Sequence, residues 1–337
     1  MKAKTFLNIL YGLKVHVLAR RINFRNAVIL SYHRVASSNT FEELYPGMIV
    51  TADNFKLQMD FLKKNYQIIS LEELISAKDK ASFPHNTAVI TFDDGYYDNY
   101  EFAYPVLNEL NLPATIFIST DFIEKGRSFF WDEVAYMVFN TKRSNFQLQL
   151  GNERVSFNLE LKSQAVTQLC LRMKQLSQME QEIILDTLSA FLAVPRNRAV
   201  SNFLTWSVMK EMQQHKISFG AHTHSHGASS VGGFNEIMSD ILKSKEVLDN
   251  KLSQNTKIFA YPFGDKTDIA LDVSQGLAKY GFKCAVTLEA GLVKIQDDPF
   301  LWKRVGIGGH DDRVRFALKT SGVLPLLSKF KAKMQGC

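Results

Sequence analysis

The sequence predicts an α/β fold in which parallel strands close, or nearly close, into a barrel surrounded by helices. Six short apolar runs alternate with helical patterns along the chain. Strands that alternate with helices imply a parallel sheet, and six or more such units are enough to form a barrel. The length of 337 residues fits either two domains or one barrel-sized domain with an insertion.

Each predicted strand is rich in β-branched or aromatic residues and ends at polar or ionisable ones. The six runs are Ala27–Tyr32, Ala88–Phe92, Ala114–Ser119, Ile217–Ala221, Ile258–Tyr261 and Cys284–Leu288. Between them, apolar residues recur at the three- and four-residue spacing of amphipathic helices. The helices expected from this spacing are Thr51–Lys64, Tyr97–Leu110, Thr205–His215, Phe234–Leu252 and Ile269–Tyr280.

One region, about 124–204, breaks this alternation within a barrel that we place at 27–312. Apolar and polar residues alternate through 143–160 around a Gly-Asn pair, which is typical of a β-hairpin. The following residues, 161–193, fit one or two helices. We therefore expect a hairpin-plus-helix insertion that either covers a rim of the barrel or shapes a substrate cleft.

The composition excludes several classes of protein. Apolar residues make up 46% and charged residues 22% of the chain, which is ordinary for a globular protein and unlike a disordered one. No stretch approaches the roughly 18 uninterrupted apolar residues of a membrane span. Cys170, Cys284 and Cys337 are odd in number and scattered. We expect reduced thiols in a cytoplasmic protein, with neither a disulfide framework nor a cysteine zinc site.

The formal net charge of +6 is concentrated at the two ends of the chain. Residues 1–41 hold seven basic residues and no acid, and 313–337 hold six basic residues and no acid. We expect a basic amphipathic segment over 1–26 and a basic tail over 313–337. Basic charge confined to the ends argues against a nucleic-acid groove across the fold, so no nucleic-acid partner is expected.

Two interpretations of the N-terminal segment stay open. Apolar residues at helical spacing between Phe6 and Val17 could dock the segment on the domain. Alternatively, the basic ends contact an anionic membrane surface, which places the protein peripherally on the inner face of the membrane. A cleaved signal peptide is less favoured, because Lys14 and His16 interrupt the apolar region.

Polar residues follow the predicted strands, and the carboxyl ends of parallel strands share one face. Adjacent carboxylates such as Asp93 and Asp94 point in different directions, so that one can bind a cation while the other faces substrate. If both are buried, their repulsion requires a metal or an arginine nearby. The alternative is a helix N-cap in a solvated turn, because Asp-Gly is common in turns.

Three histidines lie within five residues, at His222, His224 and His226. A helical turn would bring the imidazoles of His222 and His226 to one side, within reach of one ion, while His224 points elsewhere. Two histidines and one carboxylate with an open position form a catalytic set that suits zinc and similar divalent metals.

These motifs resemble those of the polysaccharide deacetylase (NodB-homology) family, which is carbohydrate esterase family four. The resemblance covers about residues 27–307 and includes features of the subgroup found in exopolysaccharide and lipopolysaccharide gene clusters. The segments that carry it are Thr91–Gly95, His222–His226, Tyr261–Gly264, Leu30–Val35 and Leu301–Val305.

The resemblance implies a distorted (β/α) barrel, often of seven strands, that removes acetyl groups from an N-acetylated sugar of a polysaccharide or glycolipid precursor. It implies that Asp93 is the catalytic base and that Asp94, His222 and His226 bind a divalent metal, for which we expect Zn²⁺. It also places an oxyanion-binding backbone N–H at Phe263. The residues expected at the substrate or oxyanion are Tyr261, Pro262, Phe263, Gly264 and Arg304.

The sequence departs from the family pattern at three motifs. No arginine stands in Phe259–Tyr261, just before the proline, so Arg34 or Arg304 is expected to orient the catalytic carboxylate. The tryptophan and acid of the fourth motif are absent from Lys283–Thr287. A Leu-x-His motif, which would supply the general acid, is missing as well.

The general acid therefore stays open between two histidines. His33 is preferred because it ends a predicted strand, although it could be structural, and His310 is the second choice. Phe129–Asp132 and Trp206 either bind sugar or pack between the barrel and the insertion. Two alternative functions also stay open: a hydrolase of a small or cyclic non-sugar amide, and a glycan-binding pseudoenzyme of the same fold.

Overall fold

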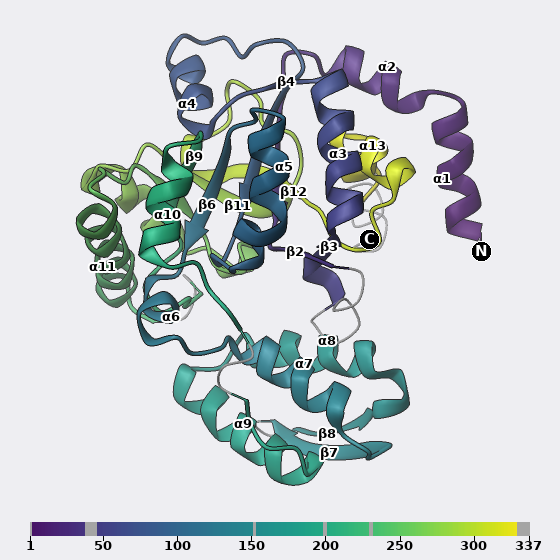
Figure 1. Cartoon of the computed structure of the whole chain (residues 1–337), viewed down its shortest axis with the longest axis vertical. Coiled ribbons are helices and arrows are strands. Elements are labelled where there is room, and N and C mark those ends of the chain that lie inside the picture. The colour runs from purple at the N-terminus through teal and green to yellow at the C-terminus, as the bar shows by residue number, and fades with distance from the viewer. Residues whose placement is uncertain (1, 38–45, 151–152, 198–200, 229–231, 329–337) are drawn as a thin grey trace.

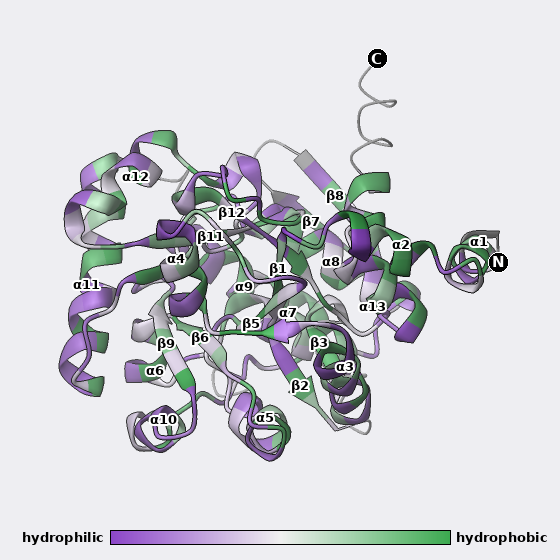
Figure 2. Cartoon of the chain, turned by 90° about the horizontal axis from the view of Figure 1, so that it is seen from above, coloured by the Kyte–Doolittle hydropathy of each residue, from purple (hydrophilic) through white to green (hydrophobic). Residues whose placement is uncertain are grey.

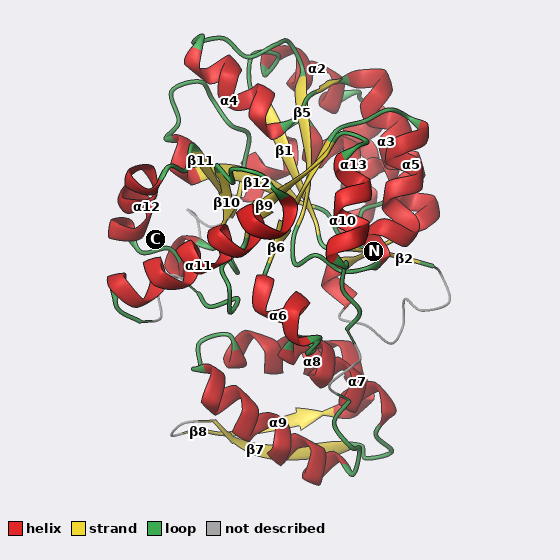
Figure 3. Cartoon of the chain, turned by 60° about the vertical axis from the view of Figure 1, so that its left-hand side comes forward, coloured by secondary structure: helices red, strands yellow, loops and turns green. Residues whose placement is uncertain are grey.

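The computed structural model of the chain describes residues 2–37, 46–150, 153–197, 201–228 and 232–328. Seven parallel strands close into a barrel, as predicted (Figure 3). The barrel closes where β1 pairs with β5 along the full length of both strands. In their order around the barrel the strands are β1 (Ala27–Tyr32), β12 (Trp302–Gly306), β11 (Cys284–Ala290), β10 (Ile258–Ala260), β9 (Ile217–Ala221), β6 (Ala114–Ile118) and β5 (Thr87–Phe92).

Helices surround the barrel, and short strands extend it. The pair β2 (Arg34–Ala36) and β3 (Ile49–Thr51) follows β1, and β4 (Gln67–Ile68) pairs with the start of β5. A π-helical turn over Asn99–Ala103 leads into α5. The outer helices are α3 (Ala52–Asn65), α4 (Leu71–Asp79), α5 (Tyr104–Glu109), α6 (Thr120–Lys125), α10 (Trp206–Gln213), α11 (Phe234–Leu252), α12 (Leu271–Gly276) and α13 (Arg313–Thr320).

All six predicted strands are confirmed to within two residues at either end. The seventh barrel strand, β12, was not predicted as a strand. Its sequence is not an apolar run, because Lys303 and Arg304 stand within it. Arg304 is nevertheless completely buried, so this strand carries a charge into the protein interior, where sequence patterns predict apolar residues.

Alternate residues of the barrel strands belong to two different cores. Ile29, Val89, Phe117 and Trp302 pack together in one cluster. The residues next to them in sequence, such as Leu30, belong to a larger cluster shared with the surrounding helices. Both faces of each strand are therefore buried, which explains the continuous apolar runs in the sequence.

The insertion has its own hydrophobic core and forms a separate layer beside the barrel (Figures 1 and 3). The predicted hairpin is confirmed: Phe146 of one strand pairs with Phe157 of the other. Its turn residues, 151–152, lie outside the described residues. The elements of the insertion are α7 (Phe130–Asn140), β7 (Asn145–Leu150), β8 (Glu153–Asn158), α8 (Lys162–Met173) and α9 (Gln178–Leu192).

The chain begins with α1 (Lys2–Gly12) and α2 (Val15–Ile22), which lie at one side of the molecule near α13 (Figures 1 and 2). Within the part of the chain that the structure describes, no helix combines the length and the apolar character needed to cross a membrane. Cys170 and Cys284 are buried free thiols, whereas Cys337 lies outside the described residues.

Candidate active site

The turn after β5 separates two neighbouring carboxylates. The backbone N–H of Asp93 donates to the carbonyl of Tyr32 at the end of β1. Asp94 and Gly95 both have left-handed backbones with φ of 77°, so the chain reverses sharply after Asp93. A Cβ atom on Gly95 would lie 2.7 Å from Ile118 Cδ1, which explains the glycine. Asp93 and Asp94 therefore point in different directions and have different partners.

Asp93 forms a buried, bidentate ion pair with Arg304 of β12. Both guanidinium Nη atoms donate to the carboxylate oxygens at 2.7 Å, and Arg304 Nε donates to the carbonyl of Thr287 at 2.8 Å. Burial raises the pKa of Asp93, but Arg304 outweighs this effect and holds the pKa below its ordinary value. Arg304 thus takes the place in space of the arginine that is missing just before Pro262.

This placement decides one expectation about Arg304 and leaves another as a prediction. Arg304 has no exposed surface and pairs with Asp93 inside the barrel, so the structure gives its expected contact with substrate no support. Arg34, the other candidate for orienting Asp93, instead donates to Asp98 at 2.7 Å and lies 3.5 Å from Asp132 of α7. Arg34 therefore ties the barrel to the insertion.

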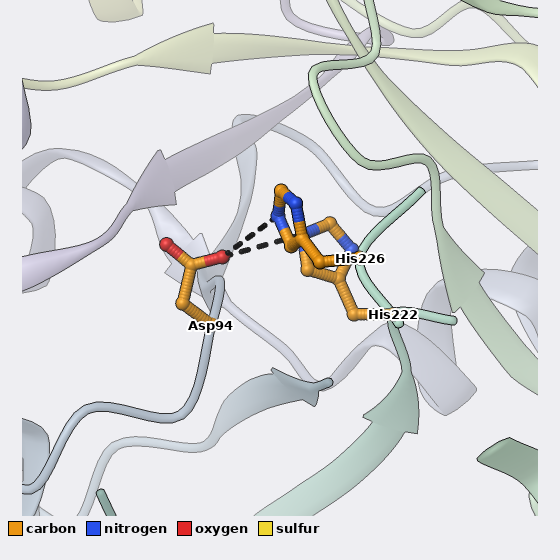
Figure 4. Close-up of side chains that lie close together, drawn as sticks. All are labelled: Asp94, His222 and His226. Atoms are coloured by element: carbon orange, nitrogen blue, oxygen red, sulfur yellow. Dashed lines mark ion pairs between the residues drawn. The ribbon is translucent and has the colours of Figure 1, made fainter. Parts of the chain in front are cut away.

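Asp94 faces two imidazoles (Figure 4). Its Oδ1 atom lies 3.5 Å from His222 Nε2 and 3.2 Å from His226 Nε2, and all three side chains are buried. The Nδ1 atom of His222 lies 2.8 Å from the carbonyl of Ala260. Because a carbonyl only accepts, Nδ1 carries a proton, and Nε2 is the ring nitrogen that faces Asp94.

These three residues fit a divalent cation. Burial raises the pKa of Asp94, but the neighbouring imidazoles outweigh it and hold the pKa far below its ordinary value. Burial lowers the pKa of His226, which favours its neutral form. Both carboxylate oxygens of Asp94 are buried without a hydrogen-bond donor among the described residues. An ionised carboxylate and two imidazole nitrogens lie within 4.8 Å of one another, as a metal site requires.

The loop after β9 brings the two histidines together in a way that the sequence did not predict. A helical turn over 222–226 was expected, but these residues form a loop in which Thr223 and His226 have left-handed backbones. The two imidazole rings still lie 4.9 Å apart, centre to centre. His224 points away, as expected, and its Nδ1 lies 2.8 Å from Thr120 Oγ1 of α6.

A cavity of about 210 Å³ opens above Asp93 and Asp94. His33 lines this cavity, and its Nε2 lies 3.8 Å from Asp93 Oδ2. His310 is exposed and is not part of the cavity wall. The lining residues are His33, Met48, Asp93, Asp94, Phe130, Trp131, Cys170, Leu171, Lys174, His222, His226, Phe263, Asp265 and Leu288.

Of the segment Tyr261–Gly264, only Phe263 lines the cavity. Its backbone is left-handed, and within the described chain no acceptor takes its N–H. Tyr261 is completely buried, and its hydroxyl donates to the carbonyl of Phe300, so the structure gives the expected contact of Tyr261 with substrate no support. Pro262 and Gly264 lie outside the cavity wall and shape the loop, since the Gly264 N–H donates to the Pro262 carbonyl at 2.6 Å.

Comparison with known proteins agrees with this geometry. A family model described as polysaccharide deacetylase matches residues 80–144 and 173–285, more than half of the chain. The chain belongs to this family. It is therefore a hydrolase of amide bonds of the polysaccharide N-deacetylase type, as the resemblance implied.

This polysaccharide deacetylase is similar to the poly-β-1,6-N-acetyl-D-glucosamine N-deacetylase of Staphylococcus epidermidis. The two are 25% identical over 298 residues, which cover 83% of this chain and 78% of the relative. The fold is similar to the Streptococcus pyogenes deacetylase PplD in complex with acetate, with a TM-score of 0.60, 21% identity and coverage of 88% and 99% of the two chains. IcaB from Ammonifex degensii gives a TM-score of 0.57 at 18% identity, with coverage of 88% and 98%.

In this deacetylase, aromatic side chains from the insertion surround His226. Trp131 and Phe129 lie 4.9 and 5.1 Å from its ring, and Phe263 lies at 5.0 Å on the barrel side. The indole N–H of Trp131 donates to the hydroxyl of Tyr96 at 2.8 Å. Trp131 thus packs between barrel and insertion and also lines the cavity. Trp206 is not part of this wall.

Lys174, just after α8, is a cavity residue that sequence reasoning missed. Its Nζ lies 3.3 Å from carboxylate oxygens of both Asp265 and Asp268, in the loop after β10. The ion pairs join residues about 90 positions apart in the chain. No local spacing or motif signals such a contact, because it depends on where the insertion sits against the barrel.

Proposed function

We propose that this deacetylase hydrolyses the acetamide of N-acetylated sugar units in a polysaccharide or glycolipid precursor, with zinc as its metal. The observation that supports the proposal most strongly is the meeting of Asp94, His222 and His226 beside Asp93 at the floor of one cavity. Three metal-binding side chains with an adjacent, separately held carboxylate are what a metal-dependent hydrolase requires.

Asp94, His222 and His226 would hold the metal. When bound, the metal polarises the acetyl carbonyl and lowers the pKa of the attacking water. The protein prepares the ligands by fixing His222 through its hydrogen bond to Ala260 and by excluding water around His226 with Trp131 and Phe263. These residues come from segments that are distant in sequence, so the fold assembles the site.

Asp93 is proposed as the general base. The paired hydrogen bonds from Arg304 keep the carboxylate ionised and fix its plane. Oδ2 also accepts from Ser31 Oγ at 3.4 Å, whereas Oδ1 retains a second lone pair. This lone pair takes the proton of the attacking water. Arg304 touches neither substrate nor water in this scheme, so it is a positioning residue.

His33 and Phe263 complete the proposed site. The amine cannot leave as an anion, so a protonated group must reach it, and His33 is in the cavity wall whereas His310 is not. The N–H of Phe263, free of an acceptor among the described residues, can donate to the oxygen that becomes negative during the reaction.

Acetate release tests the proposal. The substrate of choice is a β-1,6-linked N-acetylglucosamine oligosaccharide, because a relative that covers most of the chain is named for that polymer. We expect zinc-dependent release of acetate from the oligosaccharide and little release from a small cyclic amide. Turnover of the cyclic amide alone would favour the non-sugar alternative, and binding without turnover of either would favour a pseudoenzyme.

We also propose that the basic N-terminal segment binds an anionic membrane surface on the inner face of the membrane. The large exposed apolar side chains of α1, α2 and the link between them are Phe6, Ile9, Leu13, Leu18 and Ile22. Leu13 and Ile22 are each 71% exposed, although docking on the domain would bury such residues. Exposed basic residues, including Lys14 and Arg21, stand among them, and residues 1–41 contain no acid.

Vesicle co-sedimentation tests this second proposal. A Leu13→Ser/Ile22→Ser variant should lose binding to phosphatidylserine vesicles, and added salt should weaken binding of the wild type. Leu57→Ser is the matched control, because Leu57 of α3 is 64% exposed and lies outside the segment. Equal binding of the wild type and the double variant would mean that α1 and α2 do not contact the membrane.

A further inference from the structure

A second cavity, of about 270 Å³, lies beside the first and is walled by both the barrel and the insertion. The two cavities share the side chains of Phe130, Trp131, Lys174, His226 and Phe263. Each alone is smaller than the roughly 300–1,000 Å³ of typical ligand sites, whereas the two together fall within that range. A substrate larger than one acetylated sugar can therefore extend from the first cavity into the second.

The second cavity is lined with uncharged and charged polar groups that the first cavity lacks. Gln178 and Gln181 come from α9, Arg127 from the link between α6 and α7, and Glu236 from the start of α11. These side chains offer both donors and acceptors, as the hydroxyls of a sugar require. Trp131, in the shared wall, offers an aromatic surface for the C–H face of a pyranose ring.

Arg127 and Gln178 are held against each other in this wall. Arg127 Nη2 donates to Asp121 at 2.6 Å. With the amide of Gln178 turned so that its oxygen faces the guanidinium, this oxygen accepts from both Nη atoms at 2.6 and 2.9 Å. The Nε atom of Arg127 is buried without an acceptor in the described part of the chain. The amide nitrogen of Gln178, an exposed residue, is thus left as a donor for a ligand.

Lys174 stands at the junction of the two cavities. Its ammonium has three donors, and Asp265 and Asp268 account for two of them. The same ammonium lies 5.9 Å from the ring centre of Phe263, which lines both cavities. One donor therefore remains where the linkage between two neighbouring sugars would pass.

We propose that the second cavity binds the sugar unit next to the one being deacetylated, and that Lys174 and Gln178 contact this neighbouring unit. The inference rests on the proposed glycan substrate and deepens it. The insertion then determines substrate length: the enzyme acts on a sugar within a chain in preference to a free monosaccharide. Binding energy from the neighbouring unit would be used to place the acetamide at Asp93.

The experiment compares kcat/KM for N-acetylglucosamine with that for its β-1,6-linked dimer to hexamer, in wild type and variants. The wild type should prefer chains of two or more units. Gln178→Ala should lower kcat/KM for these chains about three- to tenfold, the effect of one or two lost hydrogen bonds, and so shrink the ratio between chain and monosaccharide. Gln175→Ala is the matched control, because Gln175 is exposed nearby but lines neither cavity.

Lys174→Met gives a second, independent variant and should shrink the same ratio. Since Asp268 is buried and pairs with Lys174, this variant could unfold, and Gln178→Ala at the exposed rim then decides the outcome. Calorimetry measures binding of the same oligosaccharides to an Asp93→Asn variant and so gives a readout without turnover. No acetate from any chain contradicts the deacetylase function. The second sugar site is overturned if acetate release or binding does not depend on chain length. It is also overturned if Gln178→Ala leaves this length dependence intact.

Discussion

The rim of the barrel and the insertion line the same cavity but hold their side chains differently. At the rim, Asp93, Asp94 and His222 are at most 2% exposed, and Asp93 and His222 are fixed by Arg304 and by a backbone carbonyl. In the insertion, the side chain of Lys174 is 16% exposed, and Gln178 lies at the surface. The difference fits the proposal that the rim carries out the reaction and the insertion selects the substrate.

Substitution of the base should give the largest effect. Asp93→Asn should lower kcat for acetate release by up to about 10⁴-fold, because an amide cannot take a proton at neutral pH. Its oxygen still accepts from Arg304, so the fold and the metal content, measured by mass spectrometry, should be retained. Asp79→Asn, at the exposed end of α4, is the control. A near-normal rate for Asp93→Asn would remove Asp93 from the reaction.

Loss of the acid at the rim should come next. His33→Ala should lower kcat about 10²-fold with metal content unchanged, because no protonated group would then reach the leaving amine. His310→Ala should have little effect, since His310 is exposed outside the cavity. The opposite pattern, with His310→Ala inactive and His33→Ala active, would place the acid at His310, in the loop between β12 and α13.

A change of the positioning residue should cost less. Arg304→Lys keeps the charge but loses the paired hydrogen bonds that fix the carboxylate plane of Asp93. We expect a loss of about 10- to 100-fold in kcat, as small displacements of a reacting group produce, with KM and metal content close to wild type. Equal loss of metal and activity would instead mean that Arg304 supports the whole site.

The sequence predicted which residues lie at the rim of the barrel better than it predicted the contacts of these residues. Asp93, Asp94 and His222 could be placed because each follows an apolar run, and strand ends of a barrel meet on one face. The partner of Asp93 stayed open between Arg34 and Arg304, because the contact with Arg304 joins positions 211 residues apart and depends on how β12 is placed in the barrel. The left-handed backbone of His226 is likewise imposed by the folded loop and has no glycine or Asn to signal it.

The ion pairs of Arg34 between the barrel and the insertion give the smallest predicted effect, which is on stability. Arg34 is shared by Asp98 and Asp132, and burial raises the pKa of both carboxyls. When the folded-state pKa exceeds the unfolded value, stability is present at low pH and is lost as the pH rises from about 4 through the folded-state pKa. Asp132→Asn removes one such group while its oxygen still accepts from Tyr96 and Ser201.

Urea unfolding at pH 4.5 and pH 7 measures this effect. Between these pH values the free energy of unfolding of Asp132→Asn should fall less than that of the wild type, by about 1.4 kcal/mol for each pKa unit of the shift. The same fall in both proteins would mean that Asp132 does not titrate with a raised pKa.

The most direct test of the account is acetate release from a β-1,6-linked N-acetylglucosamine oligosaccharide before and after treatment with a chelator. We predict that the chelator abolishes release in the wild type and that added zinc restores it. His226→Ala should not recover at the same zinc concentration, because one of its three ligands is missing. Full activity in chelator, or full zinc recovery by His226→Ala, would contradict a metal-dependent reaction at Asp94, His222 and His226.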